Sequence, residues 1–132
     1  MIKTFTIKTP QKNCLVDITD QVRSAAAETG IVSGIVHVFI PHTTAGVTIN
    51  ENADPDVVHD LLLGLDKAYP EQKAFRHYEG NSTAHLKASA MGAACSVILE
   101  DGRLLLGTWQ AVYFCEFDGS RQRNFIVKVS AD

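Results

Sequence analysis

Residues 41–56 bring together side chains that can do chemistry in a short span. The segment carries the imidazole of His42, the hydroxyls of Thr43 and Thr44 and the carboxylate of Glu51, and it follows an apolar run. A hydrophobic core has no use for this set, because burying such groups without hydrogen-bond partners is costly. We therefore predict that the segment contributes to a functional site.

Two further polar clusters lie later in the chain, within residues 77–85 and 107–121. Their candidate members are His77, Glu79, Asn81, His85, Trp109, Gln110, Glu116, Asp118 and Arg121. Each cluster adjoins an apolar segment, which is typical of a site assembled from the ends of several elements.

His42, His77 and His85 are the candidate metal ligands. Three imidazoles with a nearby carboxylate are a common ligand set for zinc or another divalent ion. The sequence has no HxH or HExxH pattern, so three separate hydrogen-bonding histidines are the alternative. His37, in a strand-like run, and His59, in a helix-like run, are expected to be packed or solvated.

The carboxylates divide into structural and functional candidates. Asp54 is placed to cap a helix, and Asp56 in its first turn suits the helix dipole. Glu51 has no such role, so it is the candidate general base, metal ligand or partner of a histidine. Glu116 and Asp118 are two residues apart, which places both on one face of a predicted strand.

Several side chains could hold a substrate. Thr43 and Thr44 could donate to a phosphate, and Arg121 could grip a phosphate or carboxylate with two hydrogen bonds. The alternative for Arg121 is an ion pair with Asp118 across the turn.

The segment after residue 106 offers groups suited to a flat ligand. Trp109 is predicted either to wall a pocket or to lie in the core. Gln110 can both donate to and accept from the edge of a heterocycle. Phosphate-binding loops, nucleophile elbows and dinucleotide fingerprints are missing from the sequence, which excludes ordinary NTPase, α/β-hydrolase and Rossmann functions.

The bulk properties indicate one domain over residues 1–132. A net charge of −3 without a run of Lys or Arg argues against nucleic acid as a partner. The sequence has neither an apolar run of about 18 residues nor a signal peptide, so we expect no membrane partner. Three cysteines without CxxC spacing are expected to be small buried hydrophobes in a reducing compartment, so the predicted location is cytoplasmic.

Apolar periodicity predicts about eight strands, at 2–8, 12–17, 31–41, 46–50, 95–100, 103–106, 111–117 and 123–129. Helices are predicted at 22–29, after a Thr19–Asp20 cap, from 54 to before 69, and at 84–91. Hairpins are expected at Asp101–Gly102 and Asp118–Gly119. The two terminal strands are expected to pair with each other or with a neighbouring strand. The predicted class is α+β, with a largely antiparallel sheet or sandwich and helices packed on one side.

Taken together, these residues resemble the YjbQ family (UPF0047). The resemblance runs almost from end to end. It rests on PHTTA at 41–45, NENADPD at 50–56, AHLKAS at 84–89, DGRLLLGTWQ at 101–110 and EFDG at 116–119, with Asn81 and Arg121. These blocks in this order are far more specific than any one of them alone.

The resemblance implies a sandwich-like α+β protomer that forms a ring-shaped homotrimer. It also implies a thiamine-phosphate synthase activity that is secondary to another role. That reaction joins hydroxymethylpyrimidine diphosphate to a thiazole phosphate and releases pyrophosphate. Positions that match motifs expected to line the site are His42, Asn50, Glu51, His85, Gln110 and Arg121.

Our leading hypothesis is an enzyme of this kind, with a small phosphorylated substrate, a divalent ion (zinc or magnesium) and a site near a subunit interface. The expected catalytic residues are His42, Glu51, His85 and Glu116. The expected substrate-binding residues are Thr43, Thr44, Asn50, Asn81, Trp109, Gln110 and Arg121, and the expected metal ligands are His42, His77 and His85. Trp109 or Phe75 could stack on a pyrimidine. The alternatives are a metal-dependent hydrolase of a phosphate or amide substrate, and a non-catalytic trimer that binds a metal or ligand.

Overall fold

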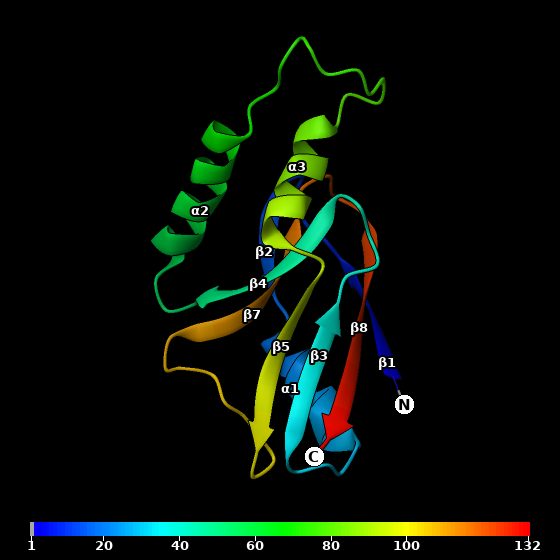
Figure 1. The fold of residues 1–132 in the computed structure, drawn as a ribbon. Helices are drawn as coiled ribbons and strands as arrows, with labels where there is room; N and C mark the ends of the chain where they lie inside the picture. The colour runs from blue at the N-terminus through cyan, green and yellow to red at the C-terminus, as the bar shows by residue number, and fades with distance from the viewer. Residues whose placement is uncertain (1) are drawn as a thin grey trace.

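The computed structural model describes residues 2–132 (Figure 1). Within them lie eight strands and three helices. The strands are β1 (Ile2–Lys8), β2 (Cys14–Asp17), β3 (Gly34–Phe39), β4 (Ala45–Glu51), β5 (Ala94–Glu100), β6 (Arg103–Leu104), β7 (Gln110–Glu116) and β8 (Gln122–Ala131). The helices are α1 (Thr19–Glu28), α2 (Pro55–Ala68) and α3 (Ser82–Met91). The predicted elements are confirmed, with ends shifted by up to three residues.

The strands form two antiparallel sheets, in the orders β1-β8-β3-β5-β6 and β2-β7-β4. The terminal strands β1 and β8 pair along their length, as the alternating pattern at both ends of the chain predicts. The α+β class with antiparallel sheets is therefore confirmed.

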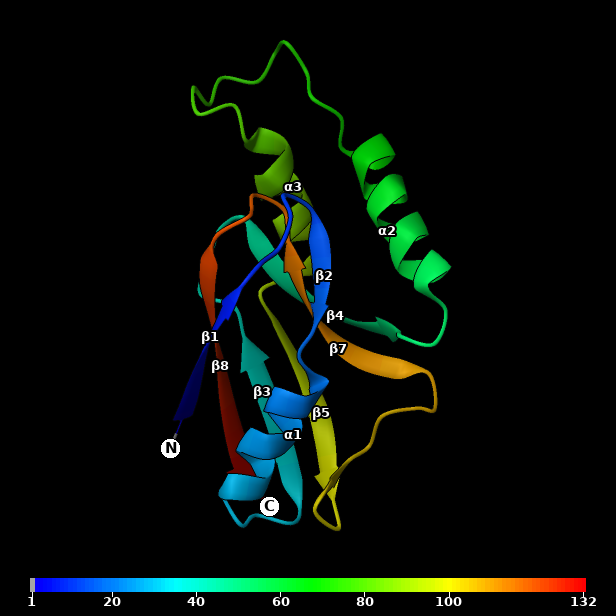
Figure 2. The same cartoon turned by 180° about the vertical axis from the view of Figure 1, so that it is seen from behind.

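The main core lies between the two sheets. Phe114 of β7 and Phe125 of β8 meet there, both fully buried, with a ring-centroid separation of 6.4 Å. Helix α1 packs against β8 and β3 of the larger sheet and against β7 of the smaller sheet (Figure 2). Its residue Val22 belongs to the same core. The apolar alternation along β8 supplies this face, because successive strand residues point to opposite sides.

The helices do not share one side of the structure, which corrects the prediction. Strand β7 shows why, since its alternate residues are buried on both faces. Val112 and Phe114 face the core that contains α1, whereas Ala111, Tyr113 and Cys115 face α3. The near-continuous apolar run of β7 is therefore the pattern of a strand covered on both faces.

Helix α2 is attached loosely. It begins at Pro55 under the Asp54 cap, whose side chain accepts from the Asp56 N–H at 2.9 Å, so that predicted cap is confirmed. None of its residues is buried, although Val58 and Leu65 pack against the cluster that α3 and β7 form, and residues 69–81 join it to α3 (Figures 1 and 2). An ion pair from buried Lys87 to Asp66 ties it to α3. No helix within residues 2–132 is long and apolar enough to cross a membrane.

Three local predictions have different outcomes. Asp101 and Gly102 both have positive φ, at 52° and 73°, and close the β5–β6 hairpin as predicted. The predicted hairpin at Asp118–Gly119 is wrong, because β7 and β8 belong to different sheets and the turn carries the chain between them. The predicted cap of α1 is also wrong, since the Asp17 carboxylate, rather than Thr19 or Asp20, accepts the Thr19 N–H.

Candidate functional site

The candidate site is a cavity of about 610 Å³ beside the N-terminal end of α3. It forms where the segment after β3, residues 77–81, the turn between the sheets and the start of β8 meet. Its lining residues include His42, Thr43, Thr44, His77, Glu79, Asn81, His85, Asp118, Arg121 and Arg123. The three polar clusters of the sequence therefore converge at one place, although not with all their members.

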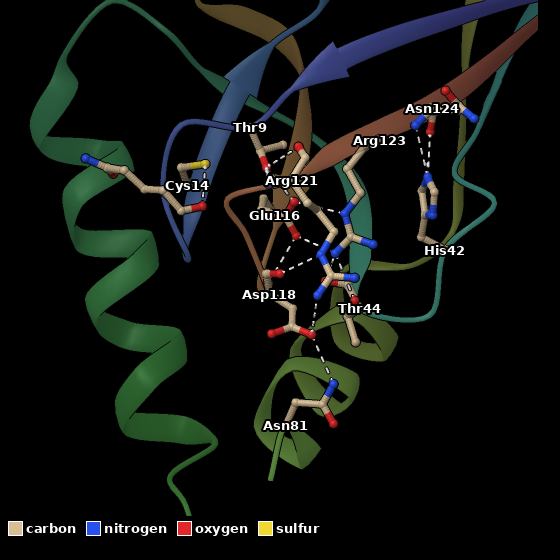
Figure 3. A network of polar contacts seen from close by, with 11 residues as sticks. Thr9, Cys14, His42, Thr44, Asn81, Glu116, Asp118, Arg121, Arg123 and Asn124 are labelled. Atoms are coloured by element: carbon tan, nitrogen blue, oxygen red, sulfur yellow. Dashed lines mark hydrogen bonds and ion pairs between the residues drawn. The ribbon is translucent and has the colours of Figure 1, made fainter. Parts of the chain in front are cut away.

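A buried ion pair forms the floor of the cavity (Figure 3). Arg123 donates from Nε to Glu116 Oε1 at 2.9 Å and from Nη2 to Glu116 Oε2 at 2.5 Å. Arg123 Nη2 also donates to the Thr44 hydroxyl at 2.8 Å. Arg123 is only 4% exposed, yet it lines the cavity, so its guanidinium is held in place to face a ligand.

Glu116 lies below the cavity, not in it, which corrects its predicted catalytic role. Its exposed fraction is 0%, and its oxygens also accept from the Thr9 hydroxyl at 2.7 Å and the Asp118 N–H at 3.0 Å. Burial by itself would raise the pKa of Glu116, but the hydrogen bonds from Arg123, Thr9 and the Asp118 amide outweigh it and hold the pKa below its usual value. Glu116 is therefore a positioning residue for Arg123.

Arg121 lies on the cavity wall in a second, more exposed ion pair. Its Nη2 donates to Asp118 Oδ2 at 3.1 Å and its Nε donates to the Asp118 carbonyl at 2.9 Å. This is the turn ion pair that the sequence left as the alternative to ligand binding. Because half of the Arg121 side chain is exposed, the pair is weak enough for an anion to compete with Asp118.

Asn81 connects the start of α3 to this turn. Its Nδ2 donates to Asp118 Oδ2 at 3.0 Å (Figure 3). Its Oδ1 is buried and has no hydrogen-bond partner within residues 2–132. A buried acceptor left unpaired is costly. A hydroxyl or N–H group of a ligand in the cavity would supply the missing donor.

The histidines converge only in part. The rings of His77 and His85 meet edge to face with centroids 5.4 Å apart, and His42 lines the same cavity. Within residues 2–132, however, no three His, Cys, Asp or Glu side chains are arranged to hold a metal ion. The convergence of the rings supports a site here, whereas a three-histidine metal centre stays a prediction.

The ring of His42 is held against the backbone of Asn124. Its Nε2 lies 3.0 Å from the Asn124 amide nitrogen and 3.1 Å from the Asn124 carbonyl oxygen, so it accepts from the N–H in one tautomer and donates to the carbonyl in the other. Burial, and next the nearby positive charge of Arg123, lowers the pKa of His42. If Nε2 accepts, Nδ1 carries the proton and can donate to a ligand; if Nε2 donates to the Asn124 carbonyl, Nδ1 has a free lone pair that can accept a proton or bind a metal.

Four predicted site residues lie elsewhere. Strand β4 begins at the cavity but ends at Glu51, which is six residues and about 20 Å further along the strand. There Glu51 pairs with Gln110 in the register of β4 and β7. Gln110 Oε1 accepts from the Gly107 N–H at 2.8 Å, and Asn50 Oδ1 accepts from the Glu51 N–H at 2.8 Å. Trp109, 61% exposed, belongs to this end as well and is not in the core.

Sequence reasoning missed Arg123. A signal was present, because Arg123 stands at an inward position of β8, in step with Phe125, Val127 and Val129. A charged residue in an otherwise apolar strand face needs a buried partner. Glu116, at the end of another apolar strand, was the candidate partner.

The cysteines take no part in the site. Cys14 and Cys115 are buried and Cys95 is half-buried, and all three are free within the described residues. Burial raises the pKa of Cys95 to about 11 and that of Cys115 to about 12. These thiols are therefore not nucleophiles at neutral pH, as the sequence predicted.

Comparison with known proteins decides the family. The model of the family described as UPF0047 protein YjbQ-like matches residues 3–132. The chain belongs to the YjbQ family. It is 54% identical to the UPF0047 protein YugU of Bacillus subtilis, over 98% of each chain. It is 48% identical to a UPF0047 protein of Methanocaldococcus jannaschii, over 100% of this chain and 96% of the other.

Solved structures of YjbQ-family proteins share the fold. An uncharacterized member from Clostridium acetobutylicum has a TM-score of 0.95 at 51% identity and covers 97% of this chain and 99% of its own. A protein of unknown function from Sulfolobus solfataricus has a TM-score of 0.94 at 30% identity and covers 100% of this chain and 97% of its own. The two-sheet architecture is thus common to bacterial and archaeal members.

Proposed function

We propose that the cavity binds a small phosphorylated substrate and that the protein is a transferase of the thiamine-phosphate synthase kind. The observation that carries the proposal is that Arg121 and Arg123 line one cavity with His42, His77 and His85. Guanidinium groups suit the geometry of phosphate oxygens, and imidazole N–H groups can donate to them.

The proposed reaction displaces pyrophosphate from a methylene carbon. The lone pair of the thiazole nitrogen forms the new C–N bond, and the C–O bond to the diphosphate breaks with both electrons leaving on oxygen. Negative charge therefore grows on the leaving group. Arg123, fixed by Glu116, and Arg121 supply preorganised positive charge for it. His85 is the proposed donor of a proton to the leaving pyrophosphate.

The residues of the cavity suit the two candidate divalent ions, zinc and Mg²⁺, to different degrees. A zinc centre on His42, His77 and His85 is not preformed within residues 2–132 and stays a prediction. Mg²⁺ differs, because it is usually held by one or two carboxylates together with substrate phosphates. Glu79 and Asp118 line the cavity and would be its protein ligands. Bound there, it would neutralise charge on the pyrophosphate.

The activity test compares the wild type with His85→Ala and Arg121→Gln. We expect thiamine phosphate to form from the two substrates with Mg²⁺, and each variant to lose at least about 100-fold in kcat/KM. His59→Ala is the matched control, because His59 is an exposed histidine on α2. No product from the wild type, or full activity in both folded variants, would contradict the proposal. Chelator-sensitive hydrolysis of a phosphate ester instead would favour the hydrolase alternative.

Asp118→Asn should tighten anion binding. The substitution keeps an oxygen that can accept from Asn81 but removes the charge that competes for Arg121. In calorimetric titration without Mg²⁺, so that Asp118 has no metal to bind, we expect the dissociation constant for pyrophosphate to fall about three- to tenfold, a gain that 0.5 M salt should largely screen. Asp20→Asn, which neutralises a similar exposed pair on Arg23, is the control. A weaker complex in the Asp118 variant without Mg²⁺ would contradict this expectation and show that the carboxylate itself contacts the ligand.

We also propose a homotrimer. Asn50, Glu51, Trp109 and Gln110 lie far from the cavity of their own chain, so a site that includes them requires a neighbouring copy. The outer face of the larger sheet supports association, since Ile35 and Phe39 of β3 and Ile98 of β5 are 42%, 46% and 57% exposed. Native mass spectrometry should give three chains of 14.4 kDa. A monomer at micromolar concentration would refute the proposal.

A further inference from the structure

A second hollow adjoins the candidate site. It has a volume of about 400 Å³ and is lined by Phe75, His77, Ser82, His85 and Leu86. His77 and His85 line both cavities, so the two imidazoles form the wall between them. A ligand that passes these rings would occupy both spaces at once.

The two cavities differ in chemistry. The first has Arg121, Arg123, Asp118 and Glu79 on its wall, whereas the second has no Arg, Lys, Asp or Glu side chain among its lining residues. Its surfaces are the ring of Phe75, the two imidazoles, the side chain of Leu86 and one hydroxyl. Such a lining suits a flat, largely apolar ring, because aromatic side chains pack against rings face to face or edge to face.

We infer that this hollow is a subsite for the aromatic ring of a substrate whose phosphate lies in the arginine-lined cavity. The inference rests on the proposed phosphate site and adds the place where the ring of an arylmethyl or heteroarylmethyl phosphate lies. The ring lies against Phe75 and Leu86, the phosphate reaches Arg121 and Arg123, and the bond between them passes beside His77 and His85. Trp109 of the same chain lines neither cavity.

Leu86 supports this assignment by its position on α3. It is 39% exposed on a helix whose neighbouring residues Ala84, Lys87 and Ala88 are buried. Neither Leu86 nor Phe75 belongs to either core cluster. Truncating them therefore tests ligand binding without dismantling the fold.

The test is titration of the full-length protein with benzyl phosphate and with methyl phosphate. The wild type should bind benzyl phosphate about tenfold more tightly, because burying the ring removes apolar surface from water. Phe75→Ala and Leu86→Ala should each lose most of that ratio and leave the affinity for methyl phosphate unchanged. Leu63→Ala, which truncates a leucine 46% exposed on α2, should keep the ratio.

The outcomes separate this inference from the proposed function. Equal affinity for the two esters in the wild type, or a ratio that survives both truncations, overturns the ring subsite and leaves the phosphate site standing. If neither ester binds, or if Arg121→Gln binds methyl phosphate as tightly as the wild type, the phosphate site fails and the ring subsite fails with it.

Discussion

Glu116→Gln is expected to lower the free energy of unfolding by about 3–5 kcal/mol, because it leaves the Arg123 guanidinium buried without a compensating charge. Glu116 is fully buried, and the Arg123 side chain is 4% exposed. Urea unfolding should show a lower midpoint at an unchanged m value. Asp20→Asn, which removes an exposed ion pair, should change stability by less than about 1 kcal/mol.

A double substitution of Glu116 and Arg123 distinguishes the effect of the unpaired charge from the effect of side-chain packing. Glu116→Leu combined with Arg123→Met replaces the pair by apolar groups of similar size, so most of the lost stability should return. The double variant should nevertheless fail to bind pyrophosphate, because it lacks the guanidinium group of Arg123. If the double variant is no more stable than Glu116→Gln, the loss comes from packing around residue 116 or from the Thr9 and Asp118 donors left unpaired, and not from the unpaired charge.

The same pair predicts an acid-labile fold. Because the folded-state pKa of Glu116 lies below its unfolded value, its contribution to stability is present above the unfolded pKa and is lost as the pH falls through the folded pKa. In Glu116→Gln this contribution to the pH dependence should vanish. Unfolding curves measured between neutral pH and pH 3 would therefore converge for the two proteins toward acid.

Gly119→Ala should destabilise the protein by about 1–3 kcal/mol or more and weaken pyrophosphate binding. A Cβ at Gly119 would lie 2.3 Å from the Gln11 carbonyl oxygen, 2.9 Å from the Thr9 hydroxyl and 2.9 Å from Glu116 Cγ. The turn must then move, and it carries the side chains of Asp118 and Arg121. Both effects arise because Gly119 packs against the cluster that holds Arg123.

Gly64→Ala is the matched control. Nothing lies within 4 Å of a Cβ at this position in α2, so the substitution should raise helix propensity and stabilise by about 0.5–1 kcal/mol. Thermal unfolding and calorimetric titration of both variants check the pair. A Gly119 variant as stable as the wild type, with unchanged affinity for pyrophosphate, would show that this close packing positions neither Arg121 nor Arg123.

The sequence by itself determined the elements, the family and most of the cavity. Period-2 runs located the strands because each has one face in the core, and the Asp54–Pro55 start defined α2 because capping is local chemistry. The sequence also indicated that His77 and His85 lie together and that His42 lines the same cavity, since polar groups that adjoin apolar elements have few other uses. Capping and strand periodicity depend on residues close together in the sequence, so they can be read without knowing the fold.

Only the tertiary structure decided which polar residues meet. Asp118–Gly119 looked like a hairpin turn, but the choice of sheet for β7 and β8 depends on long-range pairing that no local pattern contains. The same pairing buried Glu116 under Arg123 and separated Glu51, Trp109 and Gln110 from the cavity. Strand order sets these distances, because two ends of one strand lie about 20 Å apart while residues 107 positions apart, such as Thr9 and Glu116, share a hydrogen bond.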